Sequence, residues 1–135
     1  ITHYTVSAHD DLARVIERER PDFVQLNYSA VTRDAERRLL PLAADRGVAV
    51  IVNRAFEDGR LFARLKNVPL PAWAADFDAT SWAQVLLKYV IAHPAVTCVI
   101  PATGKVRNQL DNLAGGRGRL PDAMALAGIA AAVGA

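Results

Sequence analysis

Polar side chains recur at the ends of four apolar segments of this sequence. These positions are Thr2, His3, Gln25, Asn27, Asn53, Arg54 and the loop of residues 101–105. Because the carboxyl ends of parallel strands meet at one edge of a sheet, we expect these groups to converge on one rim. Capping of a strand end would explain each of them singly. Their recurrence at four strand ends favours a ligand site.

The loop of residues 102–107 follows the last of these segments and runs into a predicted helix. It contains Ala102, the Thr103 hydroxyl, Gly104 and the cations Lys105 and Arg107. Unpaired N–H groups at a helix N-terminus suit an anion, and the last loops of β/α barrels commonly bind phosphate. The Walker A spacing G-x-x-x-x-G-K-[ST] is absent from it. We therefore expect an anion-binding loop of another kind.

The spacing of histidines, serines and carboxylates does not indicate a metal site or an activated nucleophile. The histidines are His3, His9 and His93, and no two of them have the i, i+4 spacing of a zinc-binding helix. No serine lies in a G-x-S-x-G turn, and no pair of carboxylates stands out at the strand ends. We therefore expect no metal site. His93 precedes Pro94 and is expected to cap helix carbonyls.

Composition indicates a globular protein that binds neither nucleic acid nor membranes. Of the 135 residues, 52% are apolar and 22% are charged, and the net charge is +2. Arginines between residues 14 and 38 are interleaved with acidic residues, which is typical of a solvated helix surface. No apolar run reaches the roughly 20 residues that span a bilayer.

Cys98 is the only cysteine, and it lies in an apolar run, so we expect it to pack in the core. A single cysteine forms no internal disulfide, which fits a reducing compartment and a cytoplasmic location. The sequence begins at Ile1, and whether an export signal precedes it is left open.

Short apolar runs alternate with helical patterns along the chain. The expected strands are residues 1–4, 23–28, 48–53 and 96–101, and the expected helices are 10–20, 33–46, 81–93, 106–114 and 122–133. This alternation predicts an α/β fold with a parallel sheet and crossover helices. The β-branched run of the third strand predicts burial on both of its faces. Pro41 is expected to kink or interrupt the second helix.

Residues 54–80 form a long connection, and long connections in compact domains are usually functional or disordered. Four βα units cannot close an eight-stranded barrel, and the glycine fingerprint of a Rossmann sheet is absent. An open parallel sheet and a half barrel both remain possible on these grounds. A half barrel has two unpaired edges, which invite pairing with another chain segment.

Several blocks of the sequence resemble bacterial aldo/keto reductases. They are THY, DFVQLNYS, LLPLAADRGVAVIVNRAF and SWAQVLLKYVIAHPAVTCVIPATGKVRNQLDNL, in the order of that family. The similarity runs from Ile1 to about Asn112, and the last block is its most specific part. The resemblance implies a single partial domain over residues 1–135. That domain would be the C-terminal half of a TIM (β/α)8 barrel, with strands five to eight.

The family reduces carbonyls with NADPH through an Asp, Tyr, Lys and His tetrad on its first four strands and their loops. The resemblance therefore implies that this chain holds none of the catalytic residues, although it carries much of the cofactor-binding surface. The expected cofactor is NADP(H) or NAD(H), and the expected substrate is a small carbonyl compound. The expected partner is the N-terminal half of the barrel or a second copy of this chain.

By similarity, Thr2 and His3 occupy the Ser-Asn pair that holds the nicotinamide amide, and Gln25 is its third partner. The family often has Asn at the position of His3, and an imidazole still donates one hydrogen bond. Asn53 replaces an aromatic residue that often stacks on the nicotinamide. Arg54 and Phe56 lie in the loop that faces the pyrophosphate.

The resemblance assigns the adenosine end of the cofactor to the last loop and the helix after it. The loop residues Ala102, Thr103, Gly104 and Lys105 match the family's adenosine-phosphate loop. Asp111 and Asn112 match its acidic-Asn pair that contacts adenine. Asn108 stands where the family often has an arginine for the 2′-phosphate. A preference for NADPH over NADH would therefore depend on Lys105 or Arg107.

Two hypotheses follow for the function. In the first, the chain is part of a nicotinamide-dependent carbonyl reductase and needs the other half of the barrel. In the second, it is a non-catalytic half barrel that assembles with itself or with another protein.

Overall fold

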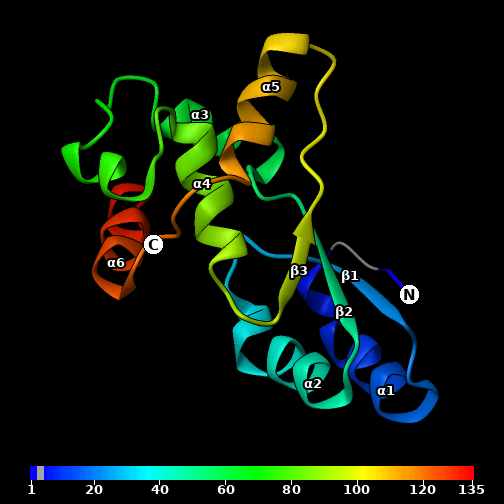
Figure 1. Ribbon diagram of the computed structural model, residues 1–135. Coiled ribbons are helices and arrows are strands. Elements are labelled where there is room, and N and C mark those ends of the chain that lie inside the picture. The colour runs from blue at the N-terminus through cyan, green and yellow to red at the C-terminus, as the bar shows by residue number, and fades with distance from the viewer. Residues whose placement is uncertain (3–4) are drawn as a thin grey trace.

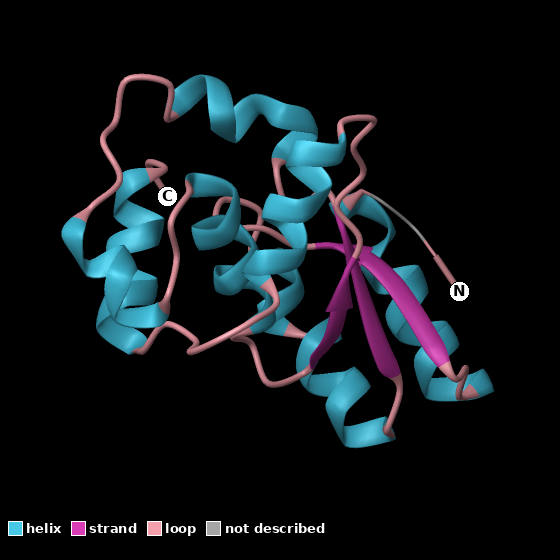
Figure 2. Ribbon diagram, turned by 45° about the horizontal axis from the view of Figure 1, so that its top comes forward, coloured by secondary structure: helices cyan, strands magenta, loops and turns pink. Residues whose placement is uncertain are grey.

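A computed structural model describes residues 1–2 and 5–135 of the chain, in which three parallel strands form one sheet (Figure 1). The strands β1 (Phe23–Asn27), β2 (Ala49–Asn53) and β3 (Val96–Val99) lie in the order β1-β2-β3. The helices are α1 (His9–Glu19), α2 (Leu39–Arg46), α3 (Arg60–Arg64), α4 (Trp82–Ile91), α5 (Val106–Gly115) and α6 (Ala123–Ala132). The predicted parallel α/β arrangement is confirmed, and the three strands run side by side in Figure 2.

The first expected strand is represented by a single bridge. Thr2 forms a parallel bridge to Gln25, and the Gln25 backbone N–H donates to the Ile1 carbonyl at 2.8 Å. The rest of that expected strand, His3 and Tyr4, lies outside the described residues. The chain start therefore pairs with the β1 edge of the sheet.

The two faces of the sheet differ in burial. Val24, Leu26, Val50 and Val52 are fully buried, whereas Ile51 between them is only half-buried. The expectation that this third predicted strand is buried on both faces is therefore wrong for one face. Successive side chains of a strand point to opposite faces, and only one face of this sheet packs into the core.

Cys98 is exposed, so the expectation that it packs in the core is also wrong. A β-bulge shifts the register of β3, so that Val50 pairs with Val96 while Ile51 pairs with Cys98. The Thr97 hydroxyl accepts a hydrogen bond from the Val50 backbone N–H at 3.0 Å, in place of a ladder carbonyl. The bulge thus places Cys98 opposite the half-buried Ile51 rather than in the core.

Local sequence explains where the helices end. α1 stops at Arg20, which adopts a left-handed conformation just before Pro21. α2 ends at Gly47, whose φ of 68° is easy for glycine and whose N–H reaches the carbonyls of Ala43 and Ala44. The expected interruption by Pro41 is confirmed. Residues 34–37 form a separate 3-10 helix, and α2 starts at Leu39, so Pro41 falls in a first turn that needs no N–H donor.

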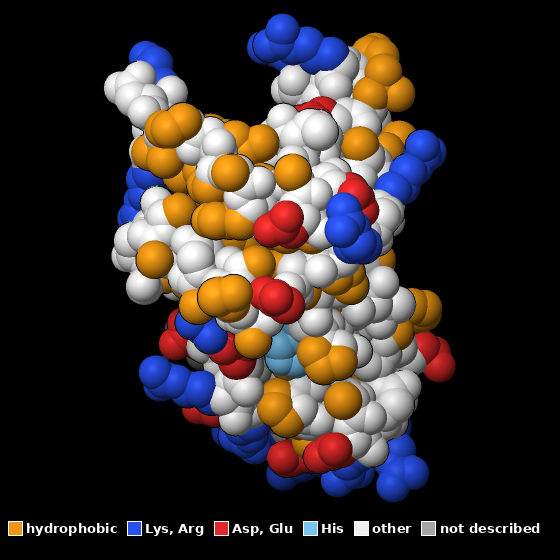
Figure 3. Space-filling view, turned by 60° about the vertical axis from the view of Figure 1, so that its left-hand side comes forward, with side chains coloured by type: hydrophobic (Ala, Val, Ile, Leu, Met, Phe, Trp, Pro, Cys, Tyr) orange, Lys and Arg blue, Asp and Glu red, His pale blue; other side chains and the backbone are white. Residues whose placement is uncertain are grey.

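The connection between β2 and α4 is ordered. It contains α3 and the 3-10 helix Ala72–Phe77, which bury Leu61 and Phe77 in the core. The Trp82 indole N–H donates to the Val68 carbonyl at 2.9 Å and ties the connection to the start of α4. Apolar side chains also gather on the outside of this part, over the face shown in Figure 3.

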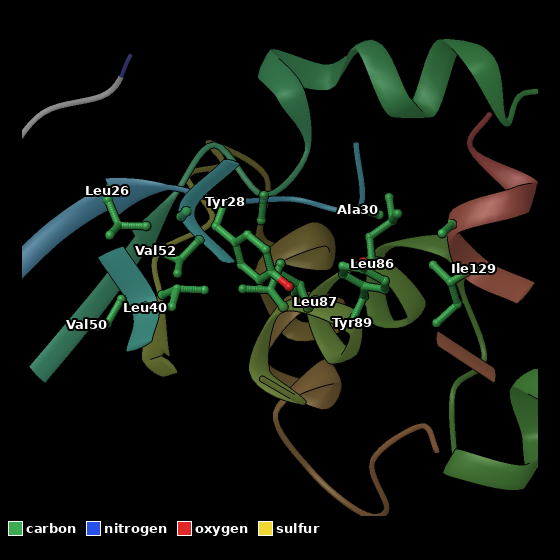
Figure 4. Close-up of a cluster of buried hydrophobic side chains, with 14 of the residues drawn as sticks. Leu26, Tyr28, Ala30, Leu40, Val50, Val52, Leu86, Leu87, Tyr89 and Ile129 are labelled. Carbon is green, nitrogen blue, oxygen red and sulfur yellow. The ribbon is translucent and has the colours of Figure 1, made fainter. Parts of the chain in front are cut away.

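The core centres on α4. Leu86, Leu87 and Tyr89 of this helix pack among Tyr28, strand side chains and Ile129 of α6 (Figure 4). Lys88 is fully buried on the same helix, and its ammonium donates to the carbonyls of Arg117 and, at 2.8 Å, Arg119. Burial lowers the pKa of Lys88, and the two carbonyls supply the hydrogen bonds that a buried amine needs.

A groove without charged residues lies at the β3 edge of the sheet. β3 is the edge strand, and a groove of about 770 Å³ lies between it and α5. The fourteen residues that line the groove include no charged side chain, in a chain that is 22% charged. On α5, Val106, Leu110 and Leu113 are spaced like one helical face, and each is more than half exposed. Exposed apolar surface of this kind, beside an open strand edge, is typical of interaction surfaces.

The bulge at Thr97 gives a prediction about stability. Replacing Thr97 with Val removes the oxygen that accepts from Val50 and leaves a part-buried N–H unpaired. We expect a loss of about 1–3 kcal/mol in the free energy of unfolding, measured by urea denaturation. Thr97→Ser keeps the hydroxyl and should lose much less. Equal losses in both variants would show that the methyl group, and not the hydrogen bond, matters.

The groove gives a prediction about assembly. We expect the isolated chain to form a dimer or a larger species in light scattering. Leu110→Glu should shift this equilibrium toward monomer, because it places a charge in the exposed stripe of α5. Met124→Glu is the control, since Met124 is 81% exposed but lies on α6. A stable, cooperatively unfolding monomer would contradict the prediction.

Candidate functional site

A pocket of about 270 Å³ opens where α5 begins, beside the connection between β2 and α4. Six of its eight lining residues are among those that the sequence singled out. The lining residues are Phe56, Phe62, Ala83, Ala102, Thr103, Asn108, Asp111 and Asn112. The Phe56 and Phe62 rings lie with their centroids 4.8 Å apart and form an aromatic wall. The pocket therefore combines an aromatic surface with amide, hydroxyl and carboxylate groups.

Thr103 folds the loop onto the first turn of α5. Its hydroxyl oxygen accepts from the Lys105 backbone N–H at 3.2 Å and from the Asn108 side-chain amide at 3.4 Å. Lys105 is the N-cap residue of α5 but gives no side-chain cap. The N–H groups of the first turn have no partner within the helix, and the helix dipole adds partial positive charge there.

Lys105 and Arg107 are both exposed at this helix start. Neither forms a salt bridge or hydrogen bond through its side chain with any described residue. Neither lines the pocket itself, and Gly104 does not line it either. The two cations are therefore exposed and without a side-chain partner among the described residues at the start of α5.

Asp111 is held by two side chains from the start of α4. One carboxylate oxygen accepts from the Ser81 hydroxyl at 2.8 Å, and the other accepts from the Gln84 side-chain amide at 2.6 Å. Ser81 is the N-cap of α4 and accepts from the Gln84 backbone N–H at 3.1 Å. Gln84 also accepts from the Thr80 backbone N–H at 3.0 Å. Asp111 thus links α5 to the capped end of α4.

Asn112 is the next residue along α5, and its side chain differs from that of Asp111 in its hydrogen bonding. It is 8% exposed, lines the pocket, and forms no side-chain hydrogen bond among the described residues. Its amide atoms are not among the buried side-chain atoms without a partner, so they keep access to the space of the pocket. An unpaired amide that faces a pocket is therefore suited to bind a ligand.

The strand-end residues lie apart from this pocket. Asn53, at the end of β2, has a buried side-chain oxygen without a hydrogen bond, and it is the only such side-chain atom in residues 1–2 and 5–135. Its register partner Asn27 contacts the His9 ring at 3.3 Å. Arg54 adopts a left-handed conformation and pairs with Asp58 at 2.6 Å. Thr2 and Gln25 meet in the bridge to β1, and the expected role of His3 lies outside the described residues.

His93 does not cap helix carbonyls as expected. Its Nδ1 accepts from the Ala95 backbone N–H at 3.2 Å, and its ring packs edge-on against Tyr28 at 5.9 Å. Burial lowers the pKa of His93, which keeps the imidazole neutral and Nδ1 free to accept. The imidazole therefore accepts a backbone hydrogen bond in the turn before β3 and does not cap the helix end.

Ser81 and Gln84 are the residues that sequence reasoning missed. The signal was present, because Ser81-Trp82-Ala83-Gln84 has the S-x-x-Q spacing of a capping box at the start of a helix. Their hydrogen bonds to Asp111, which is 30 residues from Ser81 and 27 from Gln84 in the chain, have no local signal. Phe62 was also missed, since a lone phenylalanine in a long connection carries no pattern.

Among residues 1–2 and 5–135, no group of three or more His, Cys, Asp or Glu side chains could hold a metal ion. No helix in residues 1–2 and 5–135 has the length and hydropathy to cross a membrane.

Comparison with known proteins places the chain in a family. The model of the aldo/keto reductase family matches residues 1–125. No curated protein matches the chain significantly. The aldo-keto reductase AKR11C1 from Bacillus halodurans, in its holo form, superposes with a TM-score of 0.71 at 18% identity, over 96% of this chain and 48% of its own.

Two other solved structures give the same fold. The apo form of AKR11C1 has a TM-score of 0.70 at 17% identity, over 96% of this chain and 49% of its own. The thermostable aldo-keto reductase Tm1743, in complex with the inhibitor epalrestat, has a TM-score of 0.60 at 22% identity, over 82% of this chain and 39% of its own. The chain thus spans about half the length of the solved structures it matches. With the family match over residues 1–125, the chain belongs to the aldo/keto reductase family.

Proposed function

We propose that the chain is the cofactor-binding part of a nicotinamide-dependent carbonyl reductase and holds the adenosine end of NADP(H) or NAD(H). In this proposal residues 1–135 are a partial domain that corresponds to strands five to eight of a barrel. The observation that carries it is the pocket at the start of α5, which is lined by an amide without a side-chain hydrogen bond and lies on the helix whose start carries two unpaired cations. A reducing, cytoplasmic setting fits the single, exposed Cys98.

The start of α5 fits a phosphate group. First-turn N–H groups and the helix dipole favour negative charge, and charge-assisted hydrogen bonds from Lys105 and Arg107 would add to this. Thr103 holds the loop close to the helix, with its oxygen taken by Lys105 and Asn108. Asn108 carries no positive charge, so in this proposal selectivity for a 2′-phosphate rests on the two cations.

The pocket fits a purine. The Phe56 and Phe62 rings offer a surface for stacking, and the volume of about 270 Å³ is in the range of a small aromatic ligand. Asn112 offers one amide donor group and one acceptor to the edge of the base. The adenine ring would therefore be held by stacking on one side and by hydrogen bonds on the other.

The strand ends fit the carboxamide of the nicotinamide. The unpaired oxygen of Asn53 is an acceptor at the end of β2, and Gln25 lies on the neighbouring strand. Thr2 pairs with Gln25, and His3 follows it in the chain. When bound, the nicotinamide supplies the hydride that reduces a small carbonyl compound. In the proposal, this chain orients the ring, Arg54 and Phe56 line the path of the pyrophosphate, and no residue here protonates the product.

A partner must close the sheet if this account holds. The open edge of β3 and the uncharged groove against α5 suit the addition of a strand and a helix. The N-terminal half of the barrel would supply both, together with the proton donor. A second copy of the chain is the alternative, and it would make a non-catalytic assembly that still binds nucleotide.

We predict that the chain alone does not reduce carbonyls. Hydride transfer to a carbonyl needs a proton donor for the developing alkoxide, and the proposal places that donor outside these residues. The measurement is NADPH oxidation at 340 nm with a panel of aldehydes and ketones. Turnover that persists through repeated purification and is lost in a pocket variant would contradict the prediction.

We predict that Lys105 and Arg107 bind the phosphates of the adenosine end. The double variant Lys105→Ala, Arg107→Ala should weaken NADPH binding about tenfold or more, equivalent to at least about 1.4 kcal/mol, and NADH binding much less. Dissociation constants come from fluorescence titration at fixed salt, because surface charges are screened. Lys66→Ala, in an exposed cation of the long connection, is the control. Equal losses for both nucleotides would assign the cations to the pyrophosphate, and no loss would remove the loop from the site.

A further inference from the structure

We propose that a second pocket of the chain binds a small organic cation, an ammonium group that carries apolar substituents. The pocket has a volume of about 350 Å³ and lies between α6 and the 3-10 helix Ala72–Phe77, which are neighbours in Figure 1. It shares no lining residue with the pocket at the start of α5, so the proposal stands independently of the proposed function. The lining residues are Trp73, Asp76, Phe77, Leu120, Asp122, Met124, Ala125 and Gly128.

Two aromatic side chains form one wall of this second pocket. The Trp73 and Phe77 rings lie with their centroids 5.9 Å apart and their planes 33° from parallel. Phe77 is buried, whereas Trp73 is only half-buried and lies against α6, where a Cβ on Gly128 would stand 3.5 Å from its Cζ2. Tryptophan is the aromatic side chain that attracts a cation most strongly, through the face of its ring. The wall therefore suits a ligand that is both apolar and positively charged.

The charged residues that line the second pocket are all acidic. Asp76 and Asp122 line it, and no Lys, Arg or His does. Asp76 forms no hydrogen bond or salt bridge with any described residue. Asp122 is the N-cap of α6, and one of its oxygens accepts from the Ala125 N–H at 2.8 Å, while the other has no hydrogen bond within the described part of the chain. Two carboxylates beside an aromatic wall favour a cation over an anion.

An arginine near the second pocket is held by another carboxylate. Arg119 attracts Asp76, but its guanidinium donates to the two oxygens of Asp78 at 2.7 and 3.1 Å and to the Ala75 carbonyl at 3.2 Å. The Arg119 backbone N–H also donates to Asp78, at 2.9 Å. Because the guanidinium is held at Asp78, Asp76 has no ion-pair partner among the described residues and is available to a ligand.

The size and rim of the second pocket narrow the class of ligand. Its volume of about 350 Å³ lies at the lower end of the range for small-molecule pockets. Leu120 and Met124 line it and are exposed, so part of its opening is apolar. Alkyl groups on an ammonium nitrogen would pack against these side chains and against the Trp73 indole. An alkylated ammonium ion therefore fits this pocket better than a strongly hydrated inorganic cation.

The test is an NMR titration of the isotope-labelled whole chain with choline and with 3,3-dimethylbutan-1-ol. The two probes have nearly the same shape, and only choline carries a charge. We expect saturable shifts of the Trp73 indole N–H and the Gly128 backbone N–H, with choline bound about tenfold more tightly than the alcohol. The Trp82 indole N–H is the internal control and should not shift, because it donates to the Val68 carbonyl outside this pocket.

Carboxamide variants isolate the contribution of charge. The double variant Asp76→Asn, Asp122→Asn should weaken choline binding roughly fivefold and leave the alcohol unchanged, since asparagine keeps the size of the side chain and the N-cap of α6. Asp45→Asn makes the same charge change at an exposed residue of α2 that does not line the pocket, and it should change neither affinity. Thermal unfolding of each variant shows whether the fold is retained.

A ring variant isolates the contribution of the aromatic wall. Trp73→Leu should weaken choline binding about fivefold, because a leucine keeps an apolar contact but offers no ring face to the cation. The Gly128 backbone N–H reports binding in this variant. If Trp73→Leu does not fold, Trp73→Phe keeps a weaker ring face and should give a smaller loss in the same direction.

Three results would overturn the inference. The first is equal affinity for choline and the neutral alcohol. The second is choline binding that is unchanged in the Asp76→Asn, Asp122→Asn variant. The third is the absence of saturable shifts at Trp73 and Gly128, including shifts confined to other parts of the chain. None of these results would count against the nucleotide site, because the two pockets share no lining residue.

Discussion

The burial of α4 on several sides is the constraint on which the rest of the molecule depends. This helix packs against β3, α5 and α6 and buries seven consecutive residues from Gln84 to Val90. Two of these, Gln84 and Lys88, are polar, and buried polar groups must find partners. Gln84 donates to Asp111 in the middle of α5, and Lys88 donates to carbonyls just after the end of α5. The partners that α4 requires therefore hold α5 at its middle and just beyond its C-terminal end.

The candidate site is a consequence of that placement. With Asp111 tied to α4, Asn112 is held at the pocket wall without a partner of its own, and the helix start faces outward with its cations exposed. The Arg119 side chain adds a further contact after α5 by forming an ion pair with Asp78 at 2.7 Å. That pair holds the turn before α6 close to the connection ahead of α4. The loop of residues 102–105 thus leads into a helix that is held firmly against α4.

Sequence patterns predicted the elements well, and the structure confirms their order, the break near Pro41 and the parallel pairing. The residues of the pocket were also largely predictable, since Phe56, Thr103, Asn108 and Asn112 stand in recognisable blocks. What could not be predicted came from contacts between distant segments. The bulge at Thr97, where a side-chain hydroxyl replaces a ladder carbonyl, exposes Cys98. No local sequence pattern predicts this bulge. The surroundings of Asp111 and Asn112 differ because only Asp111 hydrogen-bonds Ser81 and Gln84. Residue identity alone cannot tell them apart.

The most direct test of this account is chemical-shift mapping of the isotope-labelled chain during titration with NADP⁺. We expect saturable shifts of the Asn112 side-chain amide and of the backbone amides of Phe56, Thr103, Lys105 and Asn108. The Gln84 side-chain amide should shift little, because it stays bonded to Asp111. Absence of saturable shifts at the start of α5, or saturable shifts confined to another part of the chain, would contradict the claim that this pocket holds the adenosine end of the cofactor.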